Sequence, residues 1–298
     1  MRRLVCFLTM GFALSARAVI VSTGDGTSNQ TSSGAGSGWN YVGSVNGASG
    51  VYLGNYNGSY WVLTAGEVGG QQFTLDGVTY QPVGSDITLT NSDGSSADLK
   101  LFRVEGDAGL DALANLSLSS STPSSRSTLT LIGYGISRAS TTTSWDSDWQ
   151  EVSSGGTYTG YKWTGSGVKS WGTNSLTGTT TVTYSNGIST SAFYTSFRSF
   201  GTTAQATTGD SGGGVFTSGG ALAGIMIAVD PLTGQPDSTS ILNQQHTYIV
   251  NISAYRSEIL SYLSASPVPE PASLVFGGLG VLAILACIRL RKARAGLR

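Results

Sequence analysis

The stretch from Thr208 to Phe216 reads Thr-Gly-Asp-Ser-Gly-Gly-Gly-Val-Phe and places a single serine, Ser211, beside an aspartate and among four glycines. Glycine adopts backbone angles that residues with a Cβ avoid, so the chain can turn sharply at Gly209 and Gly212. Such a turn can hold the Ser211 hydroxyl and the Ser211 amide N–H toward one point, which is the geometry of a nucleophile beside an oxyanion hole. The alternative is an ordinary turn in a chain that holds 42 glycines, because a motif remains a hypothesis until its context supports it.

Two upstream segments supply that context. Residues 61–68 read Trp-Val-Leu-Thr-Ala-Gly-Glu-Val, and residues 97–104 read Ala-Asp-Leu-Lys-Leu-Phe-Arg-Val. With the serine stretch, they resemble in type and order the trypsin-like (chymotrypsin-fold) serine proteases, whose three motifs are Trp-Val-Leu-Thr-Ala-Ala-His, Asp-Ile-Ala-Leu-Leu-Arg-Leu and Gly-Asp-Ser-Gly-Gly. The resemblance extends to Tyr248–Arg256, which is similar to the family's last strand and closing helix, and it covers roughly residues 19–265.

The resemblance implies roles for particular residues. Ser211 is the implied nucleophile of a serine endopeptidase, Asp98 the buried aspartate, and the amides of Gly209 and Ser211 the oxyanion hole. Gln205 falls where family members that cut after Lys or Arg carry aspartate, and Val229 falls where the pocket wall often has glycine. The implied specificity pocket therefore lacks an acidic group to attract a basic side chain.

One position departs from the family pattern, because Glu67 stands where the catalytic histidine is expected. Imidazole suits proton transfer since its pKa of about 6.5 lies near working pH, whereas glutamate titrates near 4.3 and has no N–H to offer Asp98. Two adjacent carboxylates also resist joint ionisation, so one of them is expected to have a raised pKa. The only histidine, His246, follows Ser211 and is interpreted as structural.

Two functions therefore remain open. The chain is either an exported serine endopeptidase, impaired because Glu67 replaces the histidine, or an inactive pseudoprotease that binds a peptide or matrix component in its cleft. In both cases the expected partner is a peptide or protein. The sequence contains no metal-binding motif, nucleotide loop or cofactor signature, so no metal and no cofactor are expected.

The elements that must position these residues are predicted to be strands. Many short β-branched segments lie between Gly-, Ser- and Thr-rich turns, which favours an all-β fold, and the resemblance implies two packed six-stranded antiparallel barrels. The first is expected over about residues 40–117, the second over about 128–252, and a closing helix over about 253–263. Aromatic residues in the insertion around 145–161 are expected to pack on the protein's own surface, with a glycan or peptide contact as the alternative.

Both ends of the chain carry targeting patterns. Residues 1–18 have a charged start, an apolar run and small residues before Val19, which is typical of a cleaved signal peptide rather than a membrane anchor. In trypsin-like enzymes a freed aliphatic N-terminus pairs with the aspartate before the nucleophile, so an ion pair between Val19 and Asp210 is a possible consequence of this cleavage.

The C-terminal segment 267–298 opens with Pro-Val-Pro-Glu-Pro, continues with an uncharged apolar run at 272–288 and ends in a basic cluster. The run is long enough to predict a transmembrane helix with a cytoplasmic basic end. The whole segment resembles the PEP-CTERM sorting signal of Gram-negative bacteria, on which an exosortase acts. It implies at least transient anchoring in the inner membrane, followed by sorting to the cell surface. A plain C-terminal anchor is the alternative.

Charge and cysteine content narrow the partners further. The formal net charge is -1, but basic residues gather at both ends and leave eight basic against sixteen acidic residues between positions 19 and 266, about -8 for the exported part. Nucleic acid is not expected as a partner, because phosphate binding needs clustered Lys and Arg. Both cysteines, Cys6 and Cys287, lie in the terminal segments, so the domain between them is expected to rely on its packed core.

Overall fold

A computed structural model of the protein describes residues 19–32, 38–165 and 167–265. The chain divides into two compact units, residues 1–263 and 264–298. The predicted signal peptide (1–18), sorting segment (267–298) and transmembrane helix (272–288) lie outside the described residues. Within the described ranges, no helix has both the length and the apolar character needed to cross a membrane.

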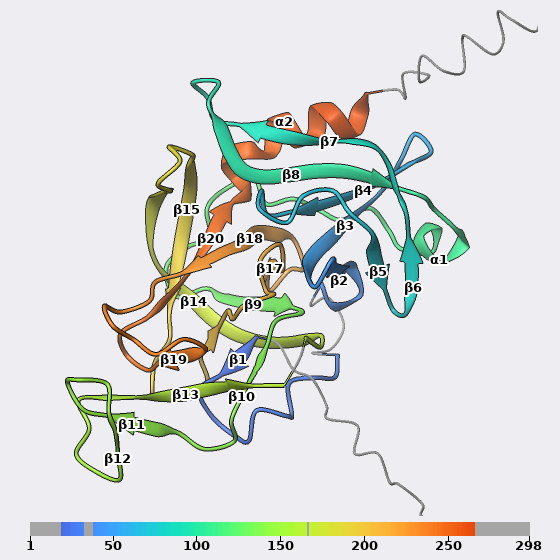
Figure 1. Cartoon of the computed structure of the whole chain (residues 1–298). Helices are drawn as coiled ribbons and strands as arrows, with labels where there is room; N and C mark the ends of the chain where they lie inside the picture. The colour runs from blue at the N-terminus through green and yellow to red at the C-terminus, as the bar shows by residue number, and fades with distance from the viewer. Residues whose placement is uncertain (1–18, 33–37, 166, 266–298) are drawn as a thin grey trace, which may run out of the picture. The chain divides into compact units, whose positions relative to one another are not determined.

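The described fold consists mostly of strands and ends in a helix, which confirms the predicted all-β class and the closing helix (Figure 1). The first half of the chain forms one seven-stranded antiparallel sheet. Its strands, in spatial order, are β6 (Val78–Tyr80), β5 (Phe73–Leu75), β2 (Val42–Val45), β3 (Ala48–Tyr56), β4 (Ser59–Thr64), β8 (Ser96–Val104) and β7 (Pro82–Thr90). The short helices η1 (Trp39–Tyr41) and α1 (Ala108–Asp111) flank it.

The first sheet differs from the predicted six-stranded barrel, because its outermost strands β6 and β7 are not paired with each other among the described residues. The strands β5 and β6 have only three residues each and therefore span about 10 Å. They meet at an Asp76-Gly77 turn, where both residues have a positive φ, 48° and 84°, as a tight two-residue hairpin turn requires. This small hairpin forms one edge of the sheet, and β7 forms the other.

The second half forms a closed six-stranded barrel, as the resemblance implied for this part of the chain. Its strands, in order around the barrel, are β14 (Ser170–Thr183), β15 (Ser189–Ser196), β20 (His246–Asn251), β18 (Leu222–Val229), β17 (Gly214–Thr217) and β9 (Thr128–Gly133). The hairpin of β14 and β15 continues past the barrel, and its tip, Tyr184–Ile188, lines a hollow together with residues of β7 and β8.

The largest cluster of buried residues joins both halves. It contains Leu63 and Leu99 from the first sheet and Phe216 and Ile225 from the barrel, each fully buried. Helix α2 (Ile252–Ser264) adds Ile252, Tyr255, Ile259 and Leu263, which share one helix face at spacings of three and four. The hydroxyl of Tyr255 donates to Asn91 and accepts from the N–H of Ser191, so the helix ties the sheet to the barrel.

The insertion expected around residues 145–161 belongs to a small antiparallel sheet, which the sequence did not predict. Its strands are β10 (Ser137–Arg138), β13 (Tyr158–Thr164), β11 (Thr143–Trp145), β12 (Glu151–Val152) and, paired with β13, β19 (Thr239–Ile241). Trp145 is buried, and Trp149 stacks on Tyr158 with the ring centroids 4.0 Å apart. These aromatic residues therefore pack on one another, in keeping with the expectation for this insertion.

The N-terminal arm is fixed by a buried arginine. Arg138 is 2% exposed and donates to the carbonyls of Val21, Thr23 and Gly24 at 2.7–2.8 Å, while its guanidinium lies 4.0 Å from the ring centroid of Tyr161. The arm also forms strand β1 (Ile20–Val21), which pairs with β16 (Ala204–Gln205). These contacts hold Val19 inside the protein.

Replacing Arg138 with leucine is expected to lower the free energy of unfolding by roughly 2–4 kcal/mol, because the carbonyls of the arm lose charged donors that water cannot fully replace. Urea denaturation of the variant measures the change. The exposed Arg126 provides the control, since Arg126→Leu is expected to stay within about 0.5 kcal/mol of the parent protein. Equal stability of the two variants would show that the arm does not depend on Arg138.

Candidate active site

The loop that carries Ser211 connects β16 to β17 and is packed against the first sheet. Gly209 and Gly212 have φ values of 95° and 85°, in the region that favours glycine. A Cβ on Gly212 would lie 2.0 Å from the carbonyl oxygen of Ser49, so no larger residue fits there. The N–H of Ser49 donates to the carbonyl of Ser211, and its hydroxyl donates to the carbonyl of Gly209. The predicted tight turn is thus held by a residue of the first sheet.

The two predicted oxyanion-hole donors are available. Among the described residues, no carbonyl or side chain accepts a hydrogen bond from the N–H of Gly209 or of Ser211. The neighbouring N–H groups of Asp210, Gly212 and Gly213 all have backbone acceptors. The free amides of Gly209 and Ser211, beside the Ser211 hydroxyl, can stabilise a developing oxyanion.

Glu67 lies beside Ser211. It follows β4 in a short turn, and its carboxyl group is near enough to the Ser211 side chain for that side chain to lower its pKa. The residue as a whole is exposed, yet partial burial of the carboxyl group raises its pKa above the ordinary value. The Ser211 side chain opposes this rise and the nearby charge of Asp98 adds to it. A carboxylate with a raised pKa that contacts a hydroxyl has the arrangement of a nucleophile with a general base.

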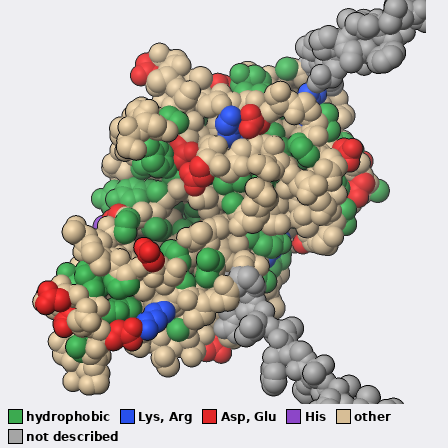
Figure 2. All heavy atoms as spheres, viewed as in Figure 1, with side chains coloured by type: hydrophobic (Ala, Val, Ile, Leu, Met, Phe, Trp, Pro, Cys, Tyr) green, Lys and Arg blue, Asp and Glu red, His purple; other side chains and the backbone are tan. Residues whose placement is uncertain are grey.

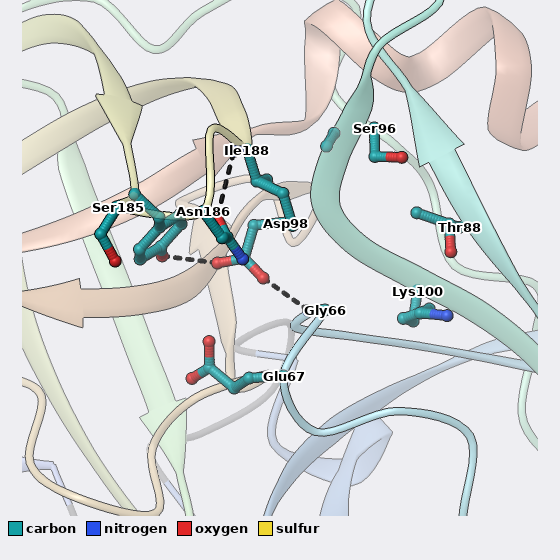
Figure 3. A pocket seen from close by; sticks show the side chains of 11 residues that line it. Gly66, Glu67, Thr88, Ser96, Asp98, Lys100, Ser185, Asn186 and Ile188 are labelled. Carbon is teal, nitrogen blue, oxygen red and sulfur yellow. Dashed lines mark hydrogen bonds between the residues drawn. The ribbon is translucent and has the colours of Figure 1, made fainter.

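Asp98 is close to Glu67 but bonded elsewhere. It is 5% exposed on β8, and its Oδ1 accepts from the N–H of Gly66 at 2.8 Å, a bond drawn in Figure 3. Its Oδ2 accepts from the hydroxyl of Tyr184 at 2.5 Å. Figure 3 draws no bond between Asp98 and Glu67, so the two carboxylates interact through charge alone. The triad arrangement in which the aspartate holds the base directly is therefore absent.

Tyr184 is a site residue that the sequence did not reveal. Burial raises the pKa of its hydroxyl, and the bond to Asp98 and the charges of Asp98 and Glu67 raise it further. No motif surrounds Tyr184 in the Ser- and Thr-rich β14–β15 hairpin, and it is separated from Asp98 by 86 positions. Only the packing of the second barrel against the first sheet brings the two together.

Glu67 separates two hollows. One has a volume of about 560 Å³ and is lined by Asp98, Lys100 and Tyr184, among others (Figure 3). The other, of about 280 Å³, adjoins Ser211. Its remaining lining residues are Glu67, Trp163, Ala206, Thr207, Thr208, Gly209, Met226, Ile227, Ala228 and Val229.

The predicted specificity residues differ in their relation to the smaller hollow. Val229 lines it, whereas Gln205 does not. Gln205 is 1% exposed, pairs with Ile20 of β1 and directs its side-chain amide toward Gln245 at 3.4 Å. Besides Glu67 at its edge, the hollow has no charged residue in its lining. Its walls combine polar residues, such as Thr207 and Thr208, with apolar ones, such as Met226 and Val229.

Trp163 is a second lining residue that the family motifs do not include, because it belongs to the inserted strand β13. Its indole N–H donates to the hydroxyl of Ser240 at 2.8 Å, and its backbone N–H donates to the carbonyl of Ser238. These bonds to the β19 segment fix the ring at the wall of the hollow.

Replacing Trp163 with alanine is expected to improve binding of peptides with a large aromatic anchor side chain by roughly tenfold relative to peptides with a small one, because a wall is removed. The measurement is a binding series on Ser211→Ala protein, with the anchor residue varied from alanine to phenylalanine. Trp149→Ala serves as control, since Trp149 lies in the same insertion but does not line the hollow. An unchanged preference in Trp163→Ala would contradict the assignment.

The N-terminal arm reaches the site from behind. The backbone N–H of Val19 lies 3.1 Å and 3.4 Å from the two carboxylate oxygens of Asp210, and both residues are fully buried. Asp210 also accepts from the N–H groups of Thr207 and Gly135, each at 2.8 Å. Burial raises the pKa of Asp210 to about 6, although these bonds oppose the rise. Val19 has a φ of 33°, an unfavourable angle for a β-branched residue.

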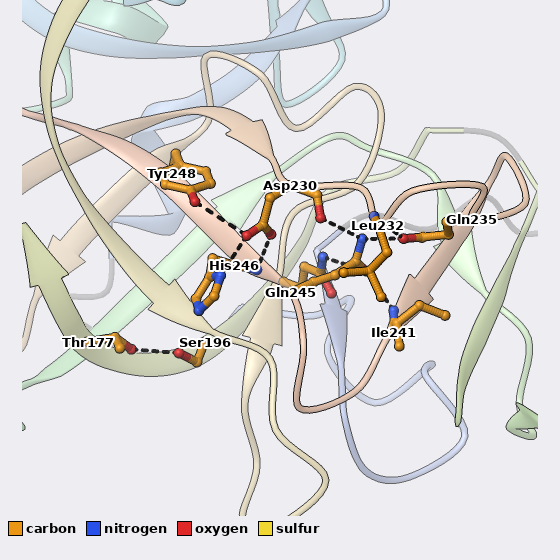
Figure 4. Close-up of polar contacts among 10 residues, drawn as sticks. Thr177, Ser196, Asp230, Leu232, Gln235, Ile241, Gln245, His246 and Tyr248 are labelled. Atoms are coloured by element: carbon orange, nitrogen blue, oxygen red, sulfur yellow. Dashed lines mark hydrogen bonds and ion pairs between the residues drawn. The ribbon is translucent and has the colours of Figure 1, made fainter. Parts of the chain in front are cut away.

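His246 lies away from the site, as expected. It begins β20, and its Nδ1 is 2.6 Å from Oδ2 of Asp230, which also bonds the hydroxyl of Tyr248 (Figure 4). Neither hollow beside Glu67 includes His246 in its lining. Within the described ranges, no group of three or more His, Cys, Asp or Glu side chains is arranged to hold a metal ion. On the face drawn in Figure 2, acidic side chains are more widespread than basic ones.

Comparison with known proteins identifies the C-terminal segment as a sorting signal. Residues 267–292 match the PEP-CTERM protein-sorting motif, which confirms the predicted sorting signal. A search of curated proteins returned no match.

Among solved structures, the inactive form of the Rv3671c protease is similar, with 10% identity, a TM-score of 0.45 and coverage of 76% of this chain and 91% of that chain. The active form of the same protease from M. tuberculosis has 11% identity, a TM-score of 0.43 and coverage of 74% and 75%. The HtrA-type protease AlgW with a decapeptide has 15% identity, a TM-score of 0.41 and coverage of 74% and 52%.

Proposed function

We propose that this chain is an exported, serine-dependent endopeptidase of the trypsin-like type in which Glu67 replaces histidine as the general base. The observation that carries the proposal is that Glu67 and Ser211 line the same hollow, with the two side chains near enough for Ser211 to lower the pKa of the Glu67 carboxyl group. A nucleophile beside its base is the arrangement on which acyl transfer depends. The free amides of Gly209 and Ser211 add the expected oxyanion hole.

In the proposed reaction, Ser211 Oγ attacks the peptide carbonyl carbon while its proton passes to Glu67. The negative charge that develops on the carbonyl oxygen is stabilised by the N–H groups of Gly209 and Ser211. Glu67 then returns the proton to the leaving amine, the C–N bond breaks, and an acyl-serine remains. A water molecule releases the acyl group by the same steps, with Glu67 first accepting and then returning a proton.

The raised pKa of Glu67 makes it a stronger base than an ordinary glutamate. A glutamate has no N–H through which the aspartate of a triad holds and orients the base, so slow turnover is expected. We assign the smaller hollow, with Val229 and Ala206 in its walls, to an apolar substrate side chain. Gln205 then supports the pocket from behind through its contacts with β1.

The pseudoprotease alternative also has an observation in its favour. Asp98 is bonded to Gly66 and Tyr184 and not to residue 67, so Glu67 has no partner that fixes its orientation as the aspartate of a triad does. In this alternative the cleft retains a peptide without cutting it. Both candidates share the same ligand class and differ only in whether Ser211 reacts.

Hydrolysis of a broad peptide library by the full chain and by its Ser211→Ala variant tests the proposal. Cleavage by the parent protein and none by the variant is the expected result. If the parent protein binds library peptides and leaves all of them intact, the pseudoprotease alternative replaces the proposal. Peptide binding by the Ser211→Ala variant confirms that the cleft is formed.

We further propose that the signal peptide exports the chain from the cytoplasm of a Gram-negative cell, and that the PEP-CTERM segment anchors it at least transiently in the inner membrane and is recognised by an exosortase-type enzyme. The proposal is supported by the match over residues 267–292 and by the signal-peptide pattern of residues 1–18. The peptidase unit then acts at the cell surface or in the surrounding matrix.

A further inference from the structure

The β14–β15 hairpin of the barrel holds Asp98 through two hydrogen bonds. Its Oδ2 accepts from the hydroxyl of Tyr184, and its backbone N–H donates to the hydroxyl of Thr190 at 2.8 Å. These two residues flank the hairpin tip between β14 and β15. The tip itself is closed by bonds from the N–H of Tyr184 to the carbonyl of Ile188 at 2.9 Å and from Gly187 back to Tyr184 at 3.0 Å. The hairpin therefore presents Tyr184 to Asp98 in a fixed position.

The bond between Tyr184 and Asp98 is the strong kind. A separation of 2.5 Å between the oxygens falls in the range of a hydroxyl bonded to an ionised acceptor. The other oxygen, Oδ1, is held by Gly66, where a Cβ would lie only 2.5 Å from it. With 5% of the residue exposed, a further donor can reach Asp98 only through the hollow that Tyr184 also lines.

We infer that Tyr184 is a positioning residue, because its hydroxyl bonds the carboxylate oxygen of Asp98 that an imidazole at position 67 would need as its acceptor. Changing Glu67 to histidine therefore does not by itself rebuild a Ser-His-Asp triad. The inference rests on the proposed roles of Glu67, Asp98 and Ser211. A triad requires the aspartate to accept from the imidazole Nδ1–H and so fix its tautomer. Here the tyrosine hydroxyl already donates to Oδ2 and the N–H of Gly66 to Oδ1, so an imidazole would have to share an oxygen that already accepts a hydrogen bond.

The same bond has a consequence for the protein as it is. By donating to Asp98, Tyr184 disperses the negative charge beside Glu67, and that charge is one cause of the raised pKa of Glu67. The ionisable residues that line the larger hollow with Glu67 are Asp98, Lys100 and Tyr184, and Lys100 is paired with Asp86 at 3.1 Å. Removal of the Tyr184 hydroxyl is therefore expected to move the titration of Glu67 to higher pH.

The test uses the full chain in three forms: Glu67→His, Glu67→His with Tyr184→Phe, and Glu67→His with Ser185→Ala as the matched control. Ser185 neighbours Tyr184 and lines the same hollow but does not bond Asp98. Two readouts are compared, the low-field proton resonance of an imidazole N–H bonded to a carboxylate and the rate at which a fluorophosphonate labels Ser211. Thermal melting confirms that each form is folded.

We expect the resonance only in the form that lacks the Tyr184 hydroxyl, with Ser211 labelled at least tenfold faster than in the other two. The inference is overturned if Glu67→His alone shows the resonance and labels equally fast, or if no form shows it. A carboxyl-carbon titration of Glu67 in Tyr184→Phe protein provides a second check, and an unchanged pKa there also contradicts the inference. None of these readouts requires the parent protein to hydrolyse peptides, so failure of the proposed function is detected separately.

Discussion

Replacing Glu67 with glutamine is expected to lower Ser211-dependent peptide turnover by about 10²–10⁴-fold, the usual contribution of a general base. Glutamine preserves the shape of the side chain and can still contact the Ser211 hydroxyl, but its amide cannot take up the proton. The loss is expected in kcat, with KM nearly unchanged, because the proton moves only during the reaction. Steady-state kinetics on a peptide cleaved by the parent protein provide the measurement.

The dependence of peptidase activity on pH provides a second test of Glu67 as the base. A base acts only when it is deprotonated, so the activity of the parent protein is expected to rise with pH through the pKa of Glu67, which burial raises above the ordinary glutamate value. Residual activity in Glu67→Gln is expected to lack this acidic limb. Glu105→Gln is the control, because Glu105 is exposed and lies outside the lining of both hollows. Unchanged peptidase activity in Glu67→Gln would exclude Glu67 as the base.

A chain that retains Ala18 before Val19 is expected to be less active than one that begins at Val19, because the buried carboxylate of Asp210, the residue before Ser211, then has no cationic partner. In the intact chain the N–H of Val19 donates to the buried Asp210 without supplying a charge. A free α-ammonium there would pair with the carboxylate, and it would remove the unfavourable φ of 33°, which exists only while a residue precedes Val19. Asp210 in turn holds the N–H of Thr207, two residues before Gly209.

The two chains are also expected to differ in how pH affects their stability. With Ala18 present, burial raises the pKa of Asp210 to about 6, above its value of about 3.9 in an unfolded chain. The native state then binds the proton more tightly, so stability is greatest below about pH 4 and falls as pH rises to about 6, by on the order of 3 kcal/mol. The chain that begins at Val19 is expected to show no such decrease in stability. Urea denaturation of both chains between pH 4 and 7 tests it, and parallel curves would contradict an ion pair.

Local motifs identified the residues of the site, and long-range packing determined how they interact. The resemblance of the segments around Ser211, Glu67 and Asp98 to family motifs predicted that the three belong to one site, and in the structure Glu67 lines both the hollow of Ser211 and the hollow of Asp98. The contact between Val19 and Asp210 was also anticipated, although the two are separated by 191 positions. The bond of Asp98 to Tyr184 could not be foreseen, because it depends on where the tip of a long hairpin falls against the first sheet.

The fold shows the same division between local and tertiary information. Strand-like segments and the Asp76-Gly77 turn are local patterns, and the structure contains them. Whether a sheet closes into a barrel depends on the pairing of its outermost strands, and β6 and β7 of the first sheet are not paired with each other among the described residues. The position of Trp163 in the smaller hollow follows from pairing of β13 with β19, two segments far apart in the sequence.

The most direct test of the central claim is covalent labelling of Ser211 by a fluorophosphonate, followed by mass spectrometry of the intact chain and of its peptides. We predict one added phosphonyl group on Ser211 in the parent protein, and a labelling rate that rises with pH through the raised pKa of Glu67. Labelling of Glu67→Gln is expected to be at least a hundredfold slower, in line with the contribution of a general base. If the parent protein stays unlabelled while still binding peptides, or if Glu67→Gln is labelled at the same rate, Glu67 does not activate Ser211.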